Sequence, residues 1–180
     1  MRVTGGDLKG RIIPSGFAHH VRPSTDRVRE SLFHSLDHQK GISQTQVLDL
    51  FSGSGIIALE FLSRNADAVY SVDLDKKNII YQNSIATNWQ LTQWHIAQGN
   101  ALNPIQTLEK YNFPTPQFDI IFADPPYGMP NIQGLHKTLY PLLSAHGWLI
   151  IEHKPQLVFA EQDLLKKEYG STTMTIFAKP

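Results

Sequence analysis

The chain contains no cysteine, and this absence removes a whole class of chemistry. Without thiols there can be neither a disulfide framework nor a thiolate that acts as nucleophile or metal ligand. The eight histidines are scattered without the spacing of metal ligands, and the adjacent His19 and His20 suit a loop better than a metal site. We therefore expect no metal in the function of this protein.

Long apolar runs are also missing. No run approaches the roughly 20 residues that a helix needs to span a bilayer, and the first residues lack the pattern of a signal peptide. We therefore expect a cytoplasmic protein with no membrane partner. The 180 residues, of which 41% are hydrophobic and 18% charged, suit one compact unit with a sizeable core.

The chain has no excess of charge, since 16 basic residues balance 16 acidic ones. A protein that holds bare nucleic acid by charge alone usually carries a basic surplus, so the balance argues against non-specific binding. The distribution is uneven, however, because residues 1–30 hold six basic and three acidic side chains. These residues therefore form a basic N-terminal segment.

Strand-like and helix-like segments alternate through most of the chain. The predicted strands are residues 46–51, 68–72, 94–97, 118–124 and 147–152. Residues 56–64, a segment through 79–86, a segment ending near 110, and residues 135–143 predict helices between them. Residues 164–169 and 172–178 predict a closing antiparallel hairpin. This order predicts an α/β fold with a seven-stranded, mostly parallel sheet.

A basic arm and one helix precede the first of these strands. Residues 1–23 predict loops and short strands, and Ser24, Thr25 and Asp26 are candidate N-caps. Apolar residues then recur at a spacing of four over residues 28–36, which predicts an amphipathic helix. We expect an extension over residues 1–40 and a main domain over residues 41–180, packed as one unit.

The segment around Asp124 carries the strongest chemical signal. Asp124 follows an apolar strand, and open α/β sheets bind ligands at the carboxyl ends of their strands. Pro125 and Pro126 remove two backbone donors, so the nearby carbonyls suit acceptance of hydrogen bonds from an amino group. Tyr127 offers a flat face for stacking on a base. A rigid turn without function is the alternative interpretation.

A second signal follows the first predicted strand. Asp49 precedes Gly53 and Gly55, which allow a ligand to approach the backbone closely. The dinucleotide fingerprint needs a third glycine, but position 58 is Ala. An acid here suits a cationic amino acid group, which favours S-adenosylmethionine over NAD. Asp73 ends the next strand, where its carboxylate is suited to accept hydrogen bonds from both ribose hydroxyls of a nucleoside. The alternative is that Asp73 caps the following helix, but Asp75 is better placed for that role.

Together these segments resemble the class I S-adenosylmethionine-dependent methyltransferases that modify exocyclic amino groups. Further matches lie at residues 5–11, 22–33, 62–66, 72–75 and 152–153, so that nearly the whole chain resembles the RsmD family. This resemblance implies a Rossmann-like class I methyltransferase fold. It also implies transfer of a methyl group to the 2-amino group of a guanine in small-subunit (16S) ribosomal RNA, with S-adenosylhomocysteine as the product.

The resemblance also assigns residues to the cofactor and to RNA. It implies that the cofactor is bound by Asp49, Phe51, Ser52, Gly53, Gly55, Asp73, Leu74, Asn100, Ala101 and Asp124. It implies RNA contacts by Arg11, Arg22, Thr25, Arg27 and Arg29, although a solvated face remains the alternative for the last two. The sequence departs from the family pattern at three positions, with Asp73 for Glu, Asn65 for Gly and Asn100 for Asp.

We expect the main role of Asp124 to be orientation of the amine, with acceptance of a proton as its second role. We expect the target to be an unpaired base in the assembled subunit. The alternatives are another acceptor, namely DNA adenine or cytosine or protein glutamine, and an inactive RNA-binding assembly protein. An NAD oxidoreductase fits least well, because the third glycine is missing. We expect a monomer.

Overall fold

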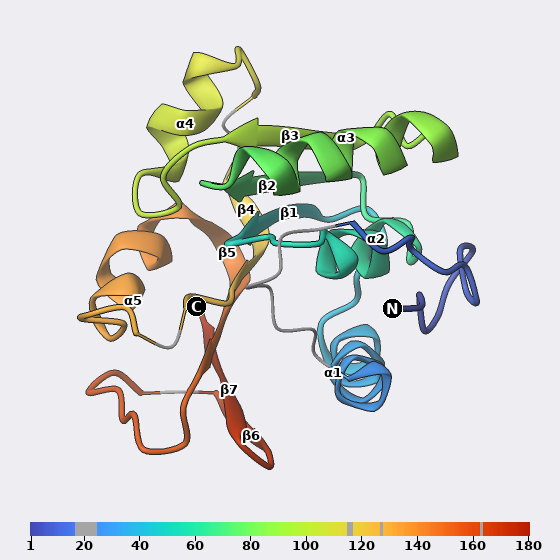
Figure 1. Cartoon of the computed structure of the whole chain (residues 1–180). Coiled ribbons are helices and arrows are strands. Elements are labelled where there is room, and N and C mark those ends of the chain that lie inside the picture. Colours follow the sequence, from blue (N-terminus) through green and yellow to red (C-terminus); the bar gives the residue numbers. More distant parts are fainter. Residues whose placement is uncertain (17–24, 115–116, 127, 163) are drawn as a thin grey trace.

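The computed structural model describes residues 1–16, 25–114, 117–126, 128–162 and 164–180 (Figure 1). Of the predicted site residues, Arg22 and Tyr127 lie outside these ranges, as do His19 and His20. A seven-stranded sheet forms the centre, in the order β3-β2-β1-β4-β5-β7-β6. The first five strands pair in parallel, whereas β7 is antiparallel to both of its neighbours. The predicted α/β fold is confirmed.

The strands are β1 (Gln46–Leu50), β2 (Ala68–Asp73), β3 (Trp94–Gln98), β4 (Phe118–Ala123), β5 (Leu143–His153), β6 (Leu165–Tyr169) and β7 (Thr172–Ala178). Every residue of β2 is buried, as is nearly every residue of β1 and β4, which explains their unbroken apolar runs. The predicted bounds are correct to within one residue except at β5, which begins four residues early. Leu143 pairs with Phe118 before a shift in register brings Trp148 opposite Ile120.

The helices are α1 (Asp26–Gln39), α2 (Ile56–Leu62), α3 (Lys76–Trp89), α4 (Pro104–Lys110) and α5 (Gly134–Leu139). Apolar residues of α1, α2 and α3 form one core cluster with one face of the sheet, and those of α4 and α5 form a second cluster with the other face (Figure 1). The prediction of a helix through residue 143 was wrong. A 3₁₀ turn over Tyr140–Leu142 follows α5, because Pro141 has no N–H to continue the α-helical ladder.

The helix caps and one helix end that the sequence predicts are present in the structure. The Thr25 hydroxyl accepts a hydrogen bond from the Val28 N–H at 3.3 Å, and the Asp75 carboxylate accepts one from the Lys77 N–H at 2.7 Å. Asn65 takes the left-handed conformation after α2, with φ of 64°. The predicted caps and this predicted helix end are thus confirmed.

The N-terminal arm packs on the core. Arg2 and Ile12 form an antiparallel bridge, and Val3 and Ile13 are buried in the cluster that also holds Leu32 of α1. Two apolar side chains therefore anchor a segment in which the sequence showed little periodicity. No helix in the described part of the chain is long and apolar enough to cross a membrane.

Candidate active site

Three acidic residues predicted for the site lie at one edge of the sheet, because parallel strands end on the same side. Asp49 lies near the end of β1, Asp73 ends β2, and Asp124 follows β4. β1 lies between β2 and β4, so its two neighbours are reached by connections that run in opposite directions. Open α/β sheets bind ligands at such a switch point, outside the carboxyl ends of the strands.

The loop between β1 and α2 has an unusual backbone. Phe51, Gly53 and Gly55 all have positive φ, at 59°, 52° and 75°. A Cβ atom at Gly55 would lie 2.6 Å from the Trp94 ring, so only glycine fits there. A left-handed conformation at Phe51 costs free energy and is a feature of functional loops. The loop is therefore held in one shape by its neighbours.

Gln82 of α3 is one of those neighbours, and the sequence analysis missed it. Its side chain is fully buried, and its Nε2 donates to Ser52 Oγ and to the Gly53 carbonyl, each at 2.9 Å. The signal was present, since a polar residue occurs between Ile79 and Ile85 on the buried face of the helix. Gln82 thus holds the loop between β1 and α2 in place through these two hydrogen bonds.

Asp49 carries a carboxyl group with no cationic partner among the residues that the structure describes. The residue is 1% exposed, and Ser71 Oγ donates to its Oδ2 at 3.4 Å. Burial, and then the nearby charge of Asp73, raise the pKa of Asp49 to about 8. A positively charged group placed here would favour the ionised carboxylate and reverse much of that shift.

Asp73 connects the glycine loop to the end of β2. Its Oδ2 accepts a hydrogen bond from the Gly53 N–H at 2.7 Å, and its Oδ1 accepts one from the Asp75 N–H at 2.8 Å. Asn78 Nδ2 donates a second hydrogen bond to Oδ1 at 3.3 Å, so Oδ2 is the oxygen that keeps a lone pair for a ribose hydroxyl. Leu74 follows with a side chain 75% exposed, which offers an apolar surface beside this acid.

Asn100 and Ala101 form a turn after β3, on the far side of β2 from Asp49. Asn100 is exposed, and its Oδ1 accepts a hydrogen bond from the Leu102 N–H at 2.9 Å. Ala101 is buried. The structure therefore places both residues at the same edge of the sheet as Asp73, since β2 and β3 are paired in parallel.

Asp124 begins the rigid segment after β4. Its N–H donates to the Leu50 carbonyl at 3.4 Å, which ties the segment to the end of β1. Asp124 is half-buried, Pro125 is buried and Pro126 is exposed. The Pro126 carbonyl accepts a hydrogen bond from the Met129 N–H at 2.8 Å and closes the turn.

The arginines predicted to contact RNA are not equivalent. Arg11 and Arg27 are exposed, and the Arg11 guanidinium lies 5.1 Å from the centre of the Trp89 ring. Thr25 is exposed as well. Arg29 is instead fully buried, which contradicts both its predicted contact with phosphate and its alternative placement on a solvated face.

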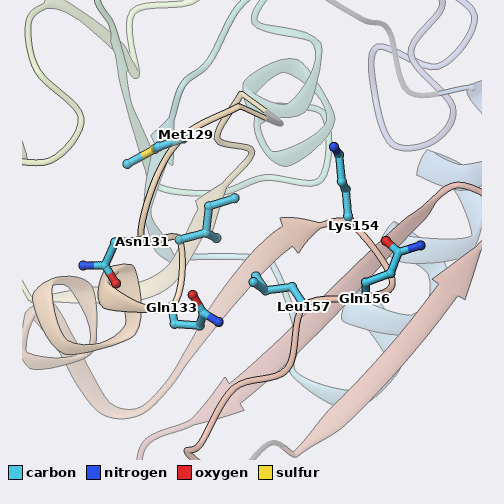
Figure 2. A pocket seen from close by; sticks show the side chains of 7 residues that line it. Met129, Asn131, Gln133, Lys154, Gln156 and Leu157 are labelled. Carbon is cyan, nitrogen blue, oxygen red and sulfur yellow. The ribbon is translucent and has the colours of Figure 1, made fainter.

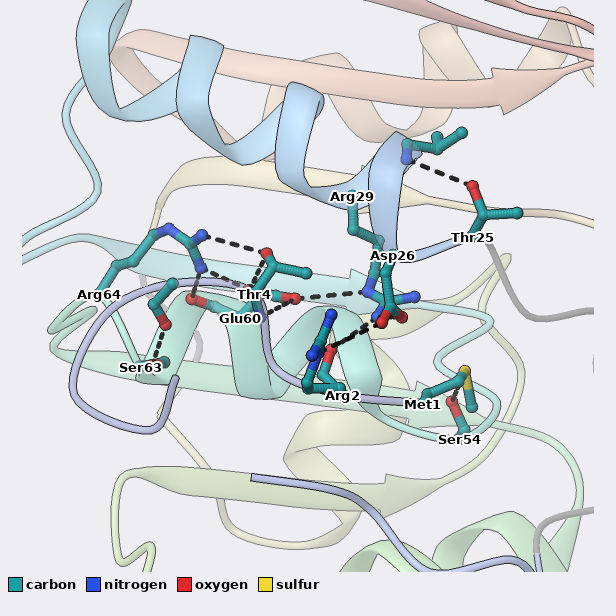
Figure 3. Close-up of polar contacts among 12 residues, drawn as sticks. Met1, Arg2, Thr4, Thr25, Asp26, Arg29, Ser54, Glu60, Ser63 and Arg64 are labelled. Carbon is teal, nitrogen blue, oxygen red and sulfur yellow. Dashed lines mark hydrogen bonds and ion pairs between the residues drawn. The ribbon is translucent and has the colours of Figure 1, made fainter. Parts of the chain in front are cut away.

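The reason for this correction is a buried ionic cluster (Figure 3). Arg29 Nε lies 3.3 Å from a carboxylate oxygen of Glu60, and its Nη2 donates to Asp26 Oδ1 and to the Arg2 carbonyl at 2.7 Å each. Glu60 also accepts from Thr4 and from Arg64. Arg29 thus holds α1, α2 and the arm together, and its donors are directed at protein groups.

Among the described residues, no group of three or more histidine, aspartate or glutamate side chains is placed to hold a metal ion. The carboxylate of Asp49 could instead pair with a cation, and that of Asp73 could accept a hydrogen bond from a hydroxyl group. The Asp124-Pro125-Pro126 segment, whose prolines have no N–H, could accept hydrogen bonds from an amine.

Known proteins resemble this chain over most of its length. The family model described as Conserved hypothetical protein 95 matches residues 1–178. A protein of Buchnera aphidicola, named ribosomal RNA small subunit methyltransferase D, is 32% identical over 163 residues, which are 91% of this chain and 76% of the relative.

Solved structures share the fold. A hypothetical protein of Thermus thermophilus has a TM-score of 0.82 and 22% identity, with 98% of each chain covered. An RNA methyltransferase of Salinibacter ruber in complex with S-adenosyl-L-homocysteine has a TM-score of 0.64 and 11% identity, with 88% of this chain and 94% of that chain covered. The fold is therefore the Rossmann-like fold of class I methyltransferases.

Proposed function

The chain belongs to the RsmD family of methyltransferases, and we propose that it transfers a methyl group from S-adenosyl-L-methionine to the 2-amino group of a guanine in 16S ribosomal RNA. The name of the Buchnera aphidicola relative supports ribosomal RNA as the substrate, and the Salinibacter ruber complex supports the cofactor. The observation that carries the proposal is the meeting of the acid–glycine loop with Asp124-Pro125-Pro126 at one edge of the sheet.

The residues at this edge fit S-adenosyl-L-methionine. Asp49 is a buried carboxyl group without a cationic partner in the described part of the chain, and the α-ammonium group of the cofactor would supply one. Asp73 would accept hydrogen bonds from the ribose hydroxyls, and Leu74 would contact the adenine. Phe51, Ser52, Gly53 and Gly55 would form the floor beneath the amino acid part, and Asn100 with Ala101 would border the adenine. When bound, the cofactor supplies an electrophilic methyl group on a sulfonium.

The chain's own residues then act on the amine. A guanine amino group is a poor nucleophile because its lone pair is delocalised into the ring. The Asp124 carboxylate and a carbonyl of the Asp124-Pro125 segment would accept its two hydrogens and direct the lone pair outward. Asp124 would take up a proton as the nitrogen becomes acidic. Tyr127 is proposed to stack on the target base.

The proposed substrate is an unpaired guanine within the assembled small subunit. Sequence-specific recognition of RNA favours splayed, unpaired bases, and the target must leave its surroundings to reach Asp124. Arg11, Arg22, Thr25 and Arg27 are proposed to contact the RNA. The balanced net charge agrees with recognition that depends on shape as well as on phosphate contacts. We propose a monomer that acts in the cytoplasm.

The test offers tritiated S-adenosyl-L-methionine with three acceptors from cells that lack the enzyme: small subunits, naked 16S RNA and duplex DNA. Label is then identified after digestion to nucleosides. We expect 2-methylguanosine from the subunits, and we expect Asp124→Ala to bind the cofactor but to transfer almost no methyl. Label in DNA would identify another acceptor. Binding of the cofactor without transfer to any acceptor would favour an inactive assembly protein.

A further inference from the structure

A pocket of about 260 Å³ opens at the same edge of the sheet as the candidate active site (Figure 2). One wall is the loop that follows the Asp124-Pro125-Pro126 segment, with Met129, Asn131, Ile132 and Gln133. The other wall follows β5, with Lys154, Gln156 and Leu157. Neither wall contains a residue that the sequence analysis assigned to the cofactor or to RNA.

Both walls are fixed to the active-site segment. The hydrogen bond from the Met129 N–H to the Pro126 carbonyl makes the first wall a direct continuation of that segment. The second wall begins one residue after β5, which pairs in parallel with β4 so that Ile151 lies opposite Ala123. Gln133 Nε2 also donates to the Val158 carbonyl at 3.5 Å, so the two walls contact each other.

The described lining of the pocket does not include Asp124 or Pro125, which are proposed to hold the reacting amine. The volume of the pocket is smaller than the roughly 300–1,000 Å³ of pockets for drug-sized ligands. The pocket therefore suits a group of about the size of one base, next to the segment that is proposed to hold the target amine.

The lining chemistry matches that of a nucleotide. Met129, Ile132 and Leu157 supply apolar surface for the faces of a ring, and a thioether packs well against aromatic groups. Asn131, Gln133 and Gln156 bring amides, which donate and accept hydrogen bonds as base edges do. Lys154 adds a cation, and the described lining contains no carboxylate that would repel phosphate.

We propose that this pocket binds the unpaired nucleotide next to the target guanine in the substrate RNA. This inference rests on the proposed function. The flanking base lies between the two walls, its edge meets the amides, and its phosphate faces Lys154. The pocket thereby contributes sequence preference at a position that the enzyme does not modify.

The test uses small subunits reconstituted from transcripts in which each neighbour of the mapped target is replaced by the other three bases. We expect the wild-type enzyme to lose about tenfold or more in kcat/KM for the replaced bases, a size typical of one stacked and hydrogen-bonded base. Gln156→Ala combined with Met129→Ala should lower kcat/KM on the native transcript and remove most of that preference. Its affinity for the cofactor should not change.

Matched controls separate this role from a general loss of charge or stability. Gln106→Ala replaces an exposed glutamine of α4 and should retain the full preference. Lys154→Ala should weaken the binding of all transcripts about equally, as loss of a phosphate contact does. Lys110→Ala, at the end of α4, should have little effect on binding.

The outcomes distinguish the inference from the proposed function. If the wild-type enzyme methylates the subunits but the double variant keeps the same preference among flanking bases, the inference is wrong and the proposed function stands. If the double variant slows all transcripts equally, the pocket binds another group, such as a ribosomal protein side chain, and the inference is again wrong. If the wild-type enzyme methylates no RNA, both fail together.

Discussion

Asp49 carries a carboxyl group whose protonation state links the stability of the protein to ligand binding. Its side chain is almost completely buried, and the pKa of the carboxyl is raised to about 8 by burial and by Asp73. Without a cationic ligand, the folded protein therefore holds a proton on Asp49 at neutral pH. A cationic ligand must displace that proton, so binding and proton release are coupled.

The first prediction concerns the stability of the ligand-free protein. Because the pKa of Asp49 is higher in the folded state than its ordinary value of 3.8, the folded state binds the proton more tightly than the unfolded chain. Its contribution is complete below about pH 4 and is lost as the pH rises to about 8, by up to about 1.4 kcal/mol per unit. Urea unfolding across this range should show the fall.

Asp49→Asn provides the control for that prediction. The amide cannot ionise, so the free energy of unfolding should depend less on pH, and the variant should be more stable than the wild type at high pH. It should also bind the cofactor more weakly, because an amide offers no negative charge to an ammonium group. Equal pH dependence in the two proteins would show that Asp49 ionises normally.

Gly55 leads to a second prediction at the same scale, with Gly41 as its matched control. Both have positive φ, at 75° and 77°, but a Cβ at Gly55 would meet the Trp94 ring at 2.6 Å, whereas no described atom lies within 4 Å at Gly41. Gly41→Ala should cost about 1–2 kcal/mol from backbone strain alone. Gly55→Ala should cost more, as measured by urea unfolding, and should also weaken cofactor binding. Similar losses would exclude a steric role for Trp94.

At the scale of elements, α1, α2 and the arm are joined by the cluster around Glu60. The Glu60 carboxylate accepts from the Thr4 N–H at 2.9 Å and from Arg64 Nη1 at 2.6 Å, besides its contact with Arg29 (Figure 3). The Arg64 guanidinium also lies 4.7 Å from the centre of the Phe33 ring. The arm that carries Arg11 is thus positioned by buried charges on two helices.

Removing one member of this cluster should be costly. Arg29→Met takes a buried cation away from the carboxylates of Asp26 and Glu60, so we expect a loss of about 3–5 kcal/mol in the free energy of unfolding. Arg27→Met changes the same residue type two positions earlier at an exposed site, and we expect a change within about 0.5 kcal/mol. Similar losses for the two variants in urea unfolding would contradict the structural role of Arg29.

The same cluster shows where local sequence patterns stop being informative. Capping by Thr25 and Asp75 was predicted because the residues involved are neighbours in the sequence. The burial of Arg29 was not, because its partner Glu60 lies 31 residues away and nothing in the helix reveals it. The strands were predicted well because burial on both faces produces a continuous apolar run.

Long-range packing also explains what was missed at β5 and at the pocket. The register shift between Phe118 and Ile120 adds an extended stretch before Gly147, which no local pattern indicates. The pocket combines a loop after β4 with a segment after β5, and neither stretch is a recognisable motif alone. The edge that holds Asp49, Asp73 and Asp124 was predictable, since each acid ends or follows a strand.

At the scale of the whole molecule, charge is balanced overall but not evenly distributed. Acidic groups gather at the carboxyl edge of the sheet, where a cationic cofactor is proposed, and exposed arginines lie on the arm and at the start of α1. A protein with equal numbers of basic and acidic residues has little long-range attraction for RNA. Recognition must then depend on a few phosphate contacts and on shape.

This balance predicts a weak dependence of binding on salt. If Arg11, Arg22 and Arg27 supply the main phosphate contacts, the logarithm of the binding constant should fall with the logarithm of salt concentration at a slope of about −2. Titrations of small subunits and of naked 16S RNA at several salt concentrations measure this slope directly. Arg27→Gln removes one phosphate contact and should make the slope less steep by nearly the share of that contact. Lys110→Gln on α4 should leave the slope unchanged. A steep slope with tight binding to naked RNA would instead mean that the enzyme binds through many phosphates, and it would contradict the proposed dependence on the shape of the assembled subunit.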